Sequence, residues 1–190
     1  MVSSIAPVAR TSQPAASEVS QQFLTFSLAG ELFAIPIEHI REIIEFNGLT
    51  EIPLMPSFLR GVINLRGAVV PVIDLAARFG RTATIMTRRT CNVILEVEQA
   101  GRMLPLGIIV DAVNEVLTVE DQQIESCPDF GARIRAEFIL GMLRLGERFV
   151  IALDIQQVLS VEEIVQLVVD DAQAVAEAEP AALVITDEGF

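Results

Sequence analysis

Pairs of short apolar runs separated by glycine-containing turns extend along most of the chain. The turns are Ala29-Gly30, Arg66-Gly67, Gln99-Ala100-Gly101 and Gly146-Glu147. Two apolar runs on either side of such a turn are typical of a β-hairpin. The pattern therefore predicts a mainly β protein with at least four hairpins.

Helical signals are few and short. Four isoleucines recur at helical spacing within residues 37–45 and predict one short helix there. Asp74 and Asp154 each follow an apolar run, and a carboxylate in that position can cap a short helical turn. Residues 161–178 have apolar residues on one face and acids on the other, which predicts a C-terminal helix that Pro180 would end.

Three polar segments are expected to lie outside the packed domain. Residues 1–20 are rich in Ser, Ala, Gln and Pro and predict a disordered arm, and residues 80–90 predict a linker or exposed loop. Residues 179–190 predict a disordered acidic tail. Removing residues 172–190 should change solubility more than stability, unless the apolar stretch 183–185 docks on a barrel edge.

The two halves of the chain resemble each other. Residues 58–65 align with residues 138–145 without a gap, and the match continues to Asp74 and Asp154. This repeat predicts two small β units, roughly 21–80 and 90–160, and leaves open whether they interleave. Short strands with Gly and Pro turns favour small barrels, and Pro71 must then lie at a strand edge or bulge.

Composition narrows the class of protein. Hydrophobic residues make up 52% of the chain, which is enough for a packed core and excludes a wholly disordered chain. The formal charge is −13 and every basic residue is Arg, which disfavours a nucleic-acid or anionic-membrane binder. The N-terminus lacks an apolar signal region, and no apolar run is long enough to span a bilayer, so a cytoplasmic protein is expected.

The residues offer little chemistry for catalysis. His39 is the single histidine and has no nucleophile motif nearby, and Cys91 and Cys127 cannot form a metal cluster or a disulfide framework. Asp74 and Asp154 could form a carboxylate pair, but their equivalent places in the repeat favour two helix caps. We therefore expect no catalysis, no metal and no cofactor.

Arg66 is the candidate for a protein contact. It is the only charged residue in the strand pair 61–73, at the tip of a predicted hairpin, and the repeat has Gly146 in its place. A guanidinium can make bidentate bonds while its stem packs on apolar surface, although a solvated turn residue is the alternative. Glu42 and Glu115 occupy equivalent apolar contexts and are either exposed residues or polar handles for a partner.

The run GVINLRGAVVPVIDL, residues 61–75, resembles the signature of CheW-type chemotaxis coupling proteins. Residues 23–28, 40–43, 107–111 and 141–159 resemble the same family, and the resemblance covers about 23–165. It implies a CheW-like domain over 21–165 that contains two packed, five-stranded SH3-like barrels with short helices.

The resemblance also implies a function. Members of this family are not enzymes, and they bridge the cytoplasmic helical tip of chemoreceptors to the regulatory domain of a chemotaxis histidine kinase. By motif match, the receptor-binding residues would be Arg66, Glu42, Ile40, Gly61, Cys91 and Gly107. The kinase contact would use exposed strand edges and turns that the sequence does not assign to residues. The protein would be cytoplasmic and recruited to membrane receptor arrays.

Two alternatives remain open at this stage. One is a coupling protein of a related chemosensory system, such as that of type IV pilus motility. The other is a β-barrel that senses a small ligand or acts as an enzyme, which a buried pocket with convergent polar groups would support.

Overall fold

The computed structural model describes residues 20–99, 101–126 and 134–160. Most of the expected arm, the expected helix 161–178, the acidic tail 179–190 and Cys127 lie outside the described residues. The expectations for them therefore stay predictions.

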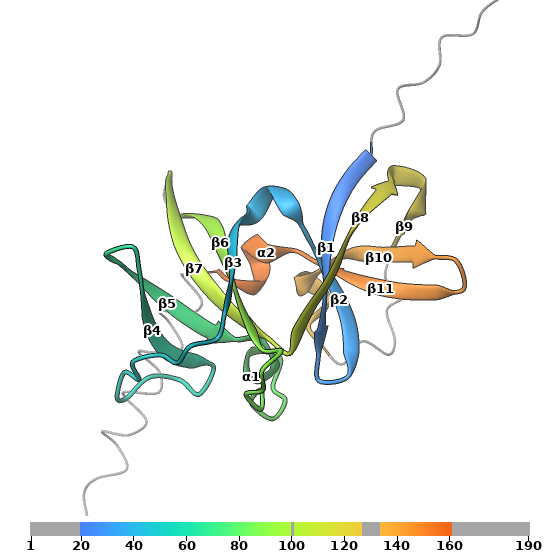
Figure 1. Ribbon diagram of the computed structural model, residues 1–190. Coiled ribbons are helices and arrows are strands. Elements are labelled where there is room, and N and C mark those ends of the chain that lie inside the picture. Colours follow the sequence, from blue (N-terminus) through green and yellow to red (C-terminus); the bar gives the residue numbers. More distant parts are fainter. Residues whose placement is uncertain (1–19, 100, 127–133, 161–190) are drawn as a thin grey trace, which may run out of the picture.

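The described chain is built from strands and very short helical turns (Figure 1). The strands are β1 (Ser20–Leu28), β2 (Glu31–Pro36), β3 (Ile40–Glu45), β4 (Leu59–Leu65), β5 (Ala68–Asp74), β6 (Cys91–Gln99), β7 (Arg102–Val110), β8 (Ala112–Glu120), β9 (Ile124–Glu125), β10 (Ile139–Leu145) and β11 (Arg148–Leu153). The helical turns are η1 (Ile37–His39), α1 (Leu75–Arg78), η2 (Asp121–Gln123), η3 (Ala136–Phe138) and α2 (Ile155–Val158).

The strands form two sheets that share one plan. The first sheet has the order β8-β1-β2-β11-β10-β9, and the second has the order β3-β6-β7-β5-β4. Each sheet contains one parallel pair, β11 with β2 and β5 with β7. Each also has a register shift at the start of a corresponding hairpin, in β10 and in β4.

The chain passes between the sheets rather than completing one and then the other. Residues 20–36 and 112–153 supply the first sheet, and residues 40–110 supply the second. The mainly β fold with two SH3-like units is confirmed. The first sheet has a sixth strand, the two-residue β9, where the second sheet has only the bridge between Thr50 and Val62.

A single large core joins the two units. Phenylalanine rings from both form a chain of contacts, with centroids 6.0 Å apart for Phe26 and Phe33, 5.8 Å for Phe33 and Phe79, and 6.0 Å for Phe79 and Phe138. Such pairs stabilise a core beyond the area that they bury. Helix α2 lies between the two sheets in Figure 1, and its Ile155 and Val158 belong to the same core.

The structure corrects one prediction made from local pattern and refines another. Residues 37–45 are not one helix, because only Ile37–His39 form a 3-10 turn and Ile40–Glu45 form strand β3. Isoleucine is β-branched and fits a strand, and its spacing here matches both periods. Residues 80–90 form a loop without helix or strand, as expected, but the loop is not exposed throughout, since Thr84 and Thr90 are buried.

Other local predictions are confirmed. The four predicted hairpins are present as β1–β2, β4–β5, β6–β7 and β10–β11. Asp74 and Asp154 cap α1 and α2. Pro71 lies where β5 pairs only with β4, because pairing with β7 begins at Val72.

Candidate partner-binding site

Three of the six candidate residues lie in one row across the second sheet. Strand register places the following residues side by side from β3 to β4: Glu42, Ile94, Gly107, Val72 and Gly61. The sequence separates Glu42 from Gly107 by more than sixty positions, so the sheet order alone brings them into line. The row gives the candidate site a rigid base of paired backbone.

Arg66 connects the two ends of this sheet. Its Nη2 donates to Oε2 of Glu42 at 2.8 Å, although β3 and β4 are the outermost strands of the sheet order. The contact therefore joins the edges of a curled, barrel-like sheet. The Glu42 side chain is 20% exposed and that of Arg66 is 77% exposed, so the guanidinium remains available to a partner.

The backbone at the hairpin tip determines where Arg66 lies. Arg66 has a φ of 53° and Gly67 a φ of 90°, so both central turn residues are left-handed. This geometry suits a two-residue β-hairpin turn, but it is unfavourable for arginine. The amide of Gly67 donates to Oδ1 of Asn64 at 2.8 Å, which stabilises the turn.

Gly61 and Gly107 act through packing. Gly61 has a φ of 142°, and a Cβ there would collide with the carbonyl oxygen of Thr50. A Cβ on Gly107 would lie 3.2 Å from a methyl group of Val72. Both glycines are buried, so they shape the sheet below the surface that Arg66 and Glu42 present.

Ile40 and Cys91 lie along the same edge. Ile40 is half-buried and packs against the main core, where it pairs with Leu95. Cys91 is half-buried, pairs with Glu45 three residues beyond Glu42, and its Sγ donates to the carbonyl oxygen of Arg89 at 3.3 Å. Strand β3 therefore holds two candidate residues, Ile40 and Glu42, and contacts two others, Cys91 and Arg66.

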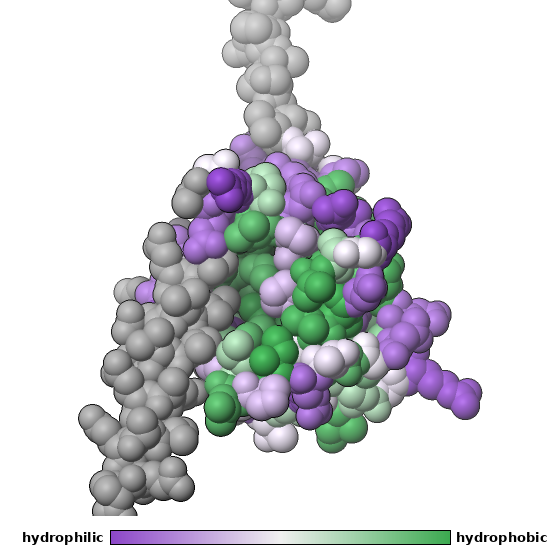
Figure 2. All heavy atoms as spheres, turned by 90° about the vertical axis from the view of Figure 1, so that its left-hand side faces the viewer, coloured by the Kyte–Doolittle hydropathy of each residue, from purple (hydrophilic) through white to green (hydrophobic). Residues whose placement is uncertain are grey.

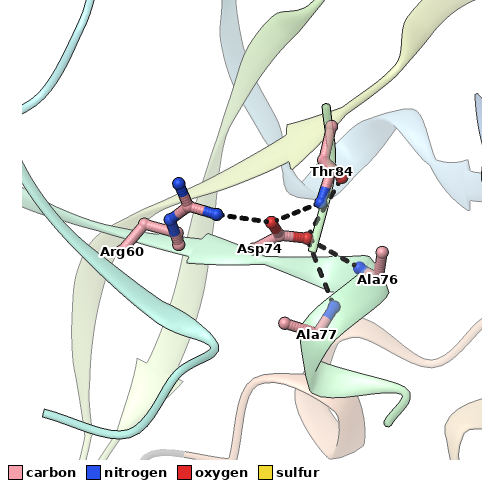
Figure 3. Close-up of polar contacts among 5 residues, drawn as sticks. All are labelled: Arg60, Asp74, Ala76, Ala77 and Thr84. Carbon is pink, nitrogen blue, oxygen red and sulfur yellow. Dashed lines mark hydrogen bonds and ion pairs between the residues drawn. The ribbon is translucent and has the colours of Figure 1, made fainter. Parts of the chain in front are cut away.

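Asp74 anchors the segments that surround the second sheet (Figure 3). Its carboxylate is fully buried and accepts from the amides of Ala76 and Ala77, at 3.0 and 3.3 Å. The amide and hydroxyl of Thr84 donate to it at 2.8 and 3.1 Å, and Nη1 of Arg60 lies 3.3 Å away. Thr84 is a residue that sequence reasoning missed, because its segment looked like an exposed loop.

Large apolar side chains are exposed on the second unit, which also carries Arg66 and Glu42. Val69, near the hairpin tip, is 68% exposed, and Ile43 of β3, which alternates with Glu42 and so points to the other face of the strand, is 43% exposed. Figure 2 shows apolar side chains gathered in the middle of the face on the β4–β5 side of the molecule, with hydrophilic residues around them. Apolar surface beside an exposed arginine is typical of a protein-binding site.

The described residues offer no assembled catalytic site at this surface. His39 is half-buried in η1 and lies 3.9 Å from Glu38, away from any nucleophile motif. Within residues 20–99, 101–126 and 134–160, no three His, Cys, Asp or Glu side chains could hold a metal ion together. No described helix is long and apolar enough to cross a membrane.

Two interlocked SH3-like β units, with an exposed arginine held at a hairpin tip by a half-buried glutamate, define a protein-binding scaffold. Comparison with known proteins gives the family. The family model for the CheW-like domain matches residues 22–163, so the chain belongs to the CheW-like family.

Individual relatives agree with this assignment. The chain is 36% identical to the chemotaxis protein CheW of Klebsiella aerogenes, over 84% of this chain and 93% of that protein. It is 35% identical to the chemotaxis protein CheW of Treponema pallidum, over 77% of this chain and 86% of that protein.

A solved structure has the same fold. The crystal structure of the scaffolding protein TtCheW from Thermoanaerobacter tengcongensis has a TM-score of 0.66 and 32% identity, covering 74% of this chain and 92% of that one. The chain is therefore a chemotaxis coupling adaptor. The comparisons do not favour the pilus-type, ligand-sensor or enzyme alternatives.

Proposed function

We propose that this adaptor couples the helical tip of a chemoreceptor to the regulatory domain of a chemotaxis histidine kinase. The receptor contact is made by the surface around Arg66, Glu42 and Ile40, with Cys91 at its edge. Gly61 and Gly107 support that surface from within the sheet. The kinase contact lies on another face, because a bridge needs two separate surfaces.

The observation that carries the proposal is the geometry of Arg66. An exposed guanidinium is held at a hairpin tip by Glu42, and the exposed Val69 lies near the same tip. A partner helix can pack on the apolar residues while a polar group on it shares the guanidinium donors. Arg66 therefore supplies both orientation and binding energy.

The adaptor acts through assembly rather than through chemistry. Holding a kinase beside a receptor allows a conformational change in the receptor to bias the kinase, since binding and conformation are thermodynamically linked. We propose that the protein has no catalytic activity, needs no cofactor, and is recruited from the cytoplasm to membrane receptor arrays by these contacts.

A three-component binding experiment tests the bridge. The full chain is mixed with a receptor cytoplasmic fragment and with the kinase regulatory domain, separately and together, and complexes are measured by analytical ultracentrifugation. We expect two binary complexes and one ternary complex. Competition between the two partners for one surface would contradict the bridge, and so would failure to bind either of them.

A further inference from the structure

A hollow of about 780 Å³ lies where the two β units meet. Ser27, Ala29 and Ala112 of the first unit line it, together with Ala76 and most of residues 82–89 of the second unit. Figure 1 shows α1 and the β1–β2 turn, which border the hollow, at the lower edge of the molecule. Pockets of about 300–1,000 Å³ commonly hold ligands, so the hollow has room for side chains of a short peptide segment.

The hollow offers an apolar contact surface. Four alanines line it, and Ile85 at its edge is 81% exposed. The segment that carries Ile85 is fixed, because the amide and hydroxyl of the neighbouring Thr84 donate to the buried Asp74. An apolar side chain on such a fixed segment is ready to pack against an apolar group that enters the hollow.

Two adjacent arginines lie at the same hollow, in the turn 87–90, here called the arginine turn. The amide of Thr90 donates to the carbonyl oxygen of Thr87 at 3.2 Å, and the amide of Thr87 donates to the hydroxyl of Thr90 at 2.8 Å. Thr90 is buried, so the turn is anchored, whereas Arg88 and Arg89 at its centre are exposed. They are the only adjacent arginines in the sequence.

Neither guanidinium of the arginine turn has an acidic partner among the described residues, although many arginines of this acidic chain do. The arginines paired with an acid are Arg41, Arg60, Arg66, Arg81, Arg135 and Arg144. One acid, Asp111, also lines the hollow, and its Oδ2 accepts from the amide of Ala29 at 2.7 Å. The arginine turn can therefore bind acidic groups beside an apolar surface.

The chain itself contains a segment of matching chemistry. Residues 161–190 contain eight acids and no base. Within them, residues 183–188 are three apolar residues and a threonine followed by the adjacent acids Asp187 and Glu188. The other adjacent acids of this region lie within the predicted helix 161–178. Segment 183–188 thus combines apolar side chains with two neighbouring acids, as the hollow combines apolar surface with two neighbouring arginines.

The described part of the chain ends near the hollow. Its last residue is Ser160, two residues after Val158. The carbonyl oxygen of Val158 accepts from Nε of Arg78 in α1 at 3.1 Å, and Ala76 of the same helical turn lines the hollow. The residues that follow Ser160 therefore start beside the element that borders the hollow.

The intervening chain is long enough to reach it. Residues 161–182 span up to about 70 Å when extended, and about 40 Å if 161–178 form the predicted helix. A domain of this size is about 35 Å across. Segment 183–188 can therefore reach the hollow of its own chain, where the short connection gives it a high effective concentration.

We propose that residues 183–188 dock in the hollow of their own chain. The apolar residues of the segment pack on the alanines and Ile85, and its two acids pair with Arg88 and Arg89. Docking covers the arginine turn and ties the two units together, because both of them line the hollow. The proposal goes beyond the adaptor function, and it replaces the disordered tail that the composition of residues 179–190 predicts.

NMR relaxation of the isotope-labelled full chain tests docking directly. Backbone order parameters of residues 183–188 should be close to the rigid value of about 0.85, whereas a free segment has values below about 0.6. Raising the salt concentration should lower them, because salt screens exposed ion pairs. The values should not depend on protein concentration, and sedimentation velocity should show a monomer under the same conditions.

Substitutions of the acids test the pairing. Asp187→Asn/Glu188→Gln should release segment 183–188, which lowers its order parameters and shifts the amide resonances of the arginine turn. The matched control Asp170→Asn/Asp171→Asn removes the same charge from the same region, and it should leave segment 183–188 ordered.

Substitutions of the arginines test the place of docking. Arg88→Gln/Arg89→Gln should release segment 183–188 as the acid variant does. Arg148→Gln, an exposed arginine on the β10–β11 hairpin, is the control and should not release it. If Arg88→Gln/Arg89→Gln does not fold, the shifts of the arginine turn in the acid variant decide the place of docking.

Four results would overturn the proposal. The first is that segment 183–188 has the order parameters of a free segment in the wild-type chain. The second is that both acid variants release it equally, which indicates a general effect of charge. The third is that Arg88→Gln/Arg89→Gln folds and leaves it ordered, which places the contact elsewhere. The fourth is that ordering appears only together with dimers, which makes a second copy the occupant.

Discussion

The two β units have the same strand plan but different polar residues at equivalent places. The β4–β5 hairpin ends in Arg66, which bonds to Glu42, whereas the β10–β11 hairpin has Gly146 there. Asp74 makes five polar contacts, whereas the side chain of Asp154 accepts one bond, from Gln157. The second unit thus has polar contacts that the first unit lacks at the equivalent places, one of them buried at Asp74 and one at the surface at Arg66.

Glutamates in the repeat show the same divergence. Glu42 is half-buried and holds Arg66, whereas Glu115 is exposed, and only its backbone is involved, in bonds with the hydroxyl of Thr25. A glutamate is thus present at this place in both units, but only in the second unit does its side chain hold an arginine. The following predictions test this contrast, from the largest expected effect to the smallest.

The largest effect is expected at the two aspartates. Asp74→Ala should lower the free energy of unfolding by about 3–5 kcal/mol, because it leaves buried donors and Arg60 without their acceptor. Asp154→Ala should cost about 1 kcal/mol, the usual cost of losing a helix cap. Urea unfolding measures both. Equal losses would show that Asp74 is no more than a cap.

A second contrast concerns the interiors of the two units. Phe23→Ala should destabilise the protein by about 3 kcal/mol or more, because it empties a fully buried position. Asn92→Ala should be close to neutral, since it removes an amide whose oxygen has no partner. Melting temperatures of the two variants test this contrast. A large drop in the melting temperature of Asn92→Ala would mean that the amide stabilises the fold.

Gly61 and Gly141 occupy equivalent places in the repeat, and replacing Gly61 should cost more stability than replacing Gly141. Gly61→Ala forces a Cβ onto the Thr50 carbonyl at a positive φ, which should cost about 2–3 kcal/mol. Gly141→Ala meets a methyl group of Ile124 at 2.8 Å and the carbonyl oxygen of Glu125 at 3.2 Å, contacts less close than that at Gly61, and its φ is not positive, so it should cost less, about 1–2 kcal/mol. Chemical denaturation of both variants, compared at matched m-values, tests this order. A larger loss of unfolding free energy in Gly141→Ala would contradict it.

The smallest effect on stability is expected at the hairpin tip. Arg66→Ala removes a pair whose guanidinium is largely exposed, and such pairs contribute less than about 1 kcal/mol. Arg148→Ala, on the other hairpin, serves as the control. Melting temperatures of both variants should stay close to that of the wild type. A marked loss in Arg66→Ala alone would assign Arg66 a structural role.

Local chemistry allowed the hairpins and caps to be predicted, because each depends on residues that are close in sequence. Ala29-Gly30 and Arg66-Gly67 mark turns, and Asp74 bonds to amides two and three residues away. Strand β3 was mistaken for a helix because its isoleucines fit both periods over so short a run. The correct signal was the alternation of Ile40, Glu42 and Ile44 with exposed residues.

Contacts between distant segments could not be predicted. No local pattern shows that β1 pairs with β8 or that Thr84 reaches Asp74. The same applies to the pair Arg66–Glu42, because it depends on the curl of the whole second sheet.

The central claim is that the Arg66 surface binds the receptor, and one comparison tests it most directly. Affinity for a receptor cytoplasmic fragment is measured by calorimetry for the wild type, Arg66→Glu and Arg148→Glu, after circular dichroism has shown that all three are folded. Reversing a charge in a buried contact costs about 2–5 kcal/mol, so Arg66→Glu should bind at least about 30-fold more weakly. Arg148→Glu should bind like the wild type. Wild-type affinity in folded Arg66→Glu, or an equal loss in both variants, would contradict the account.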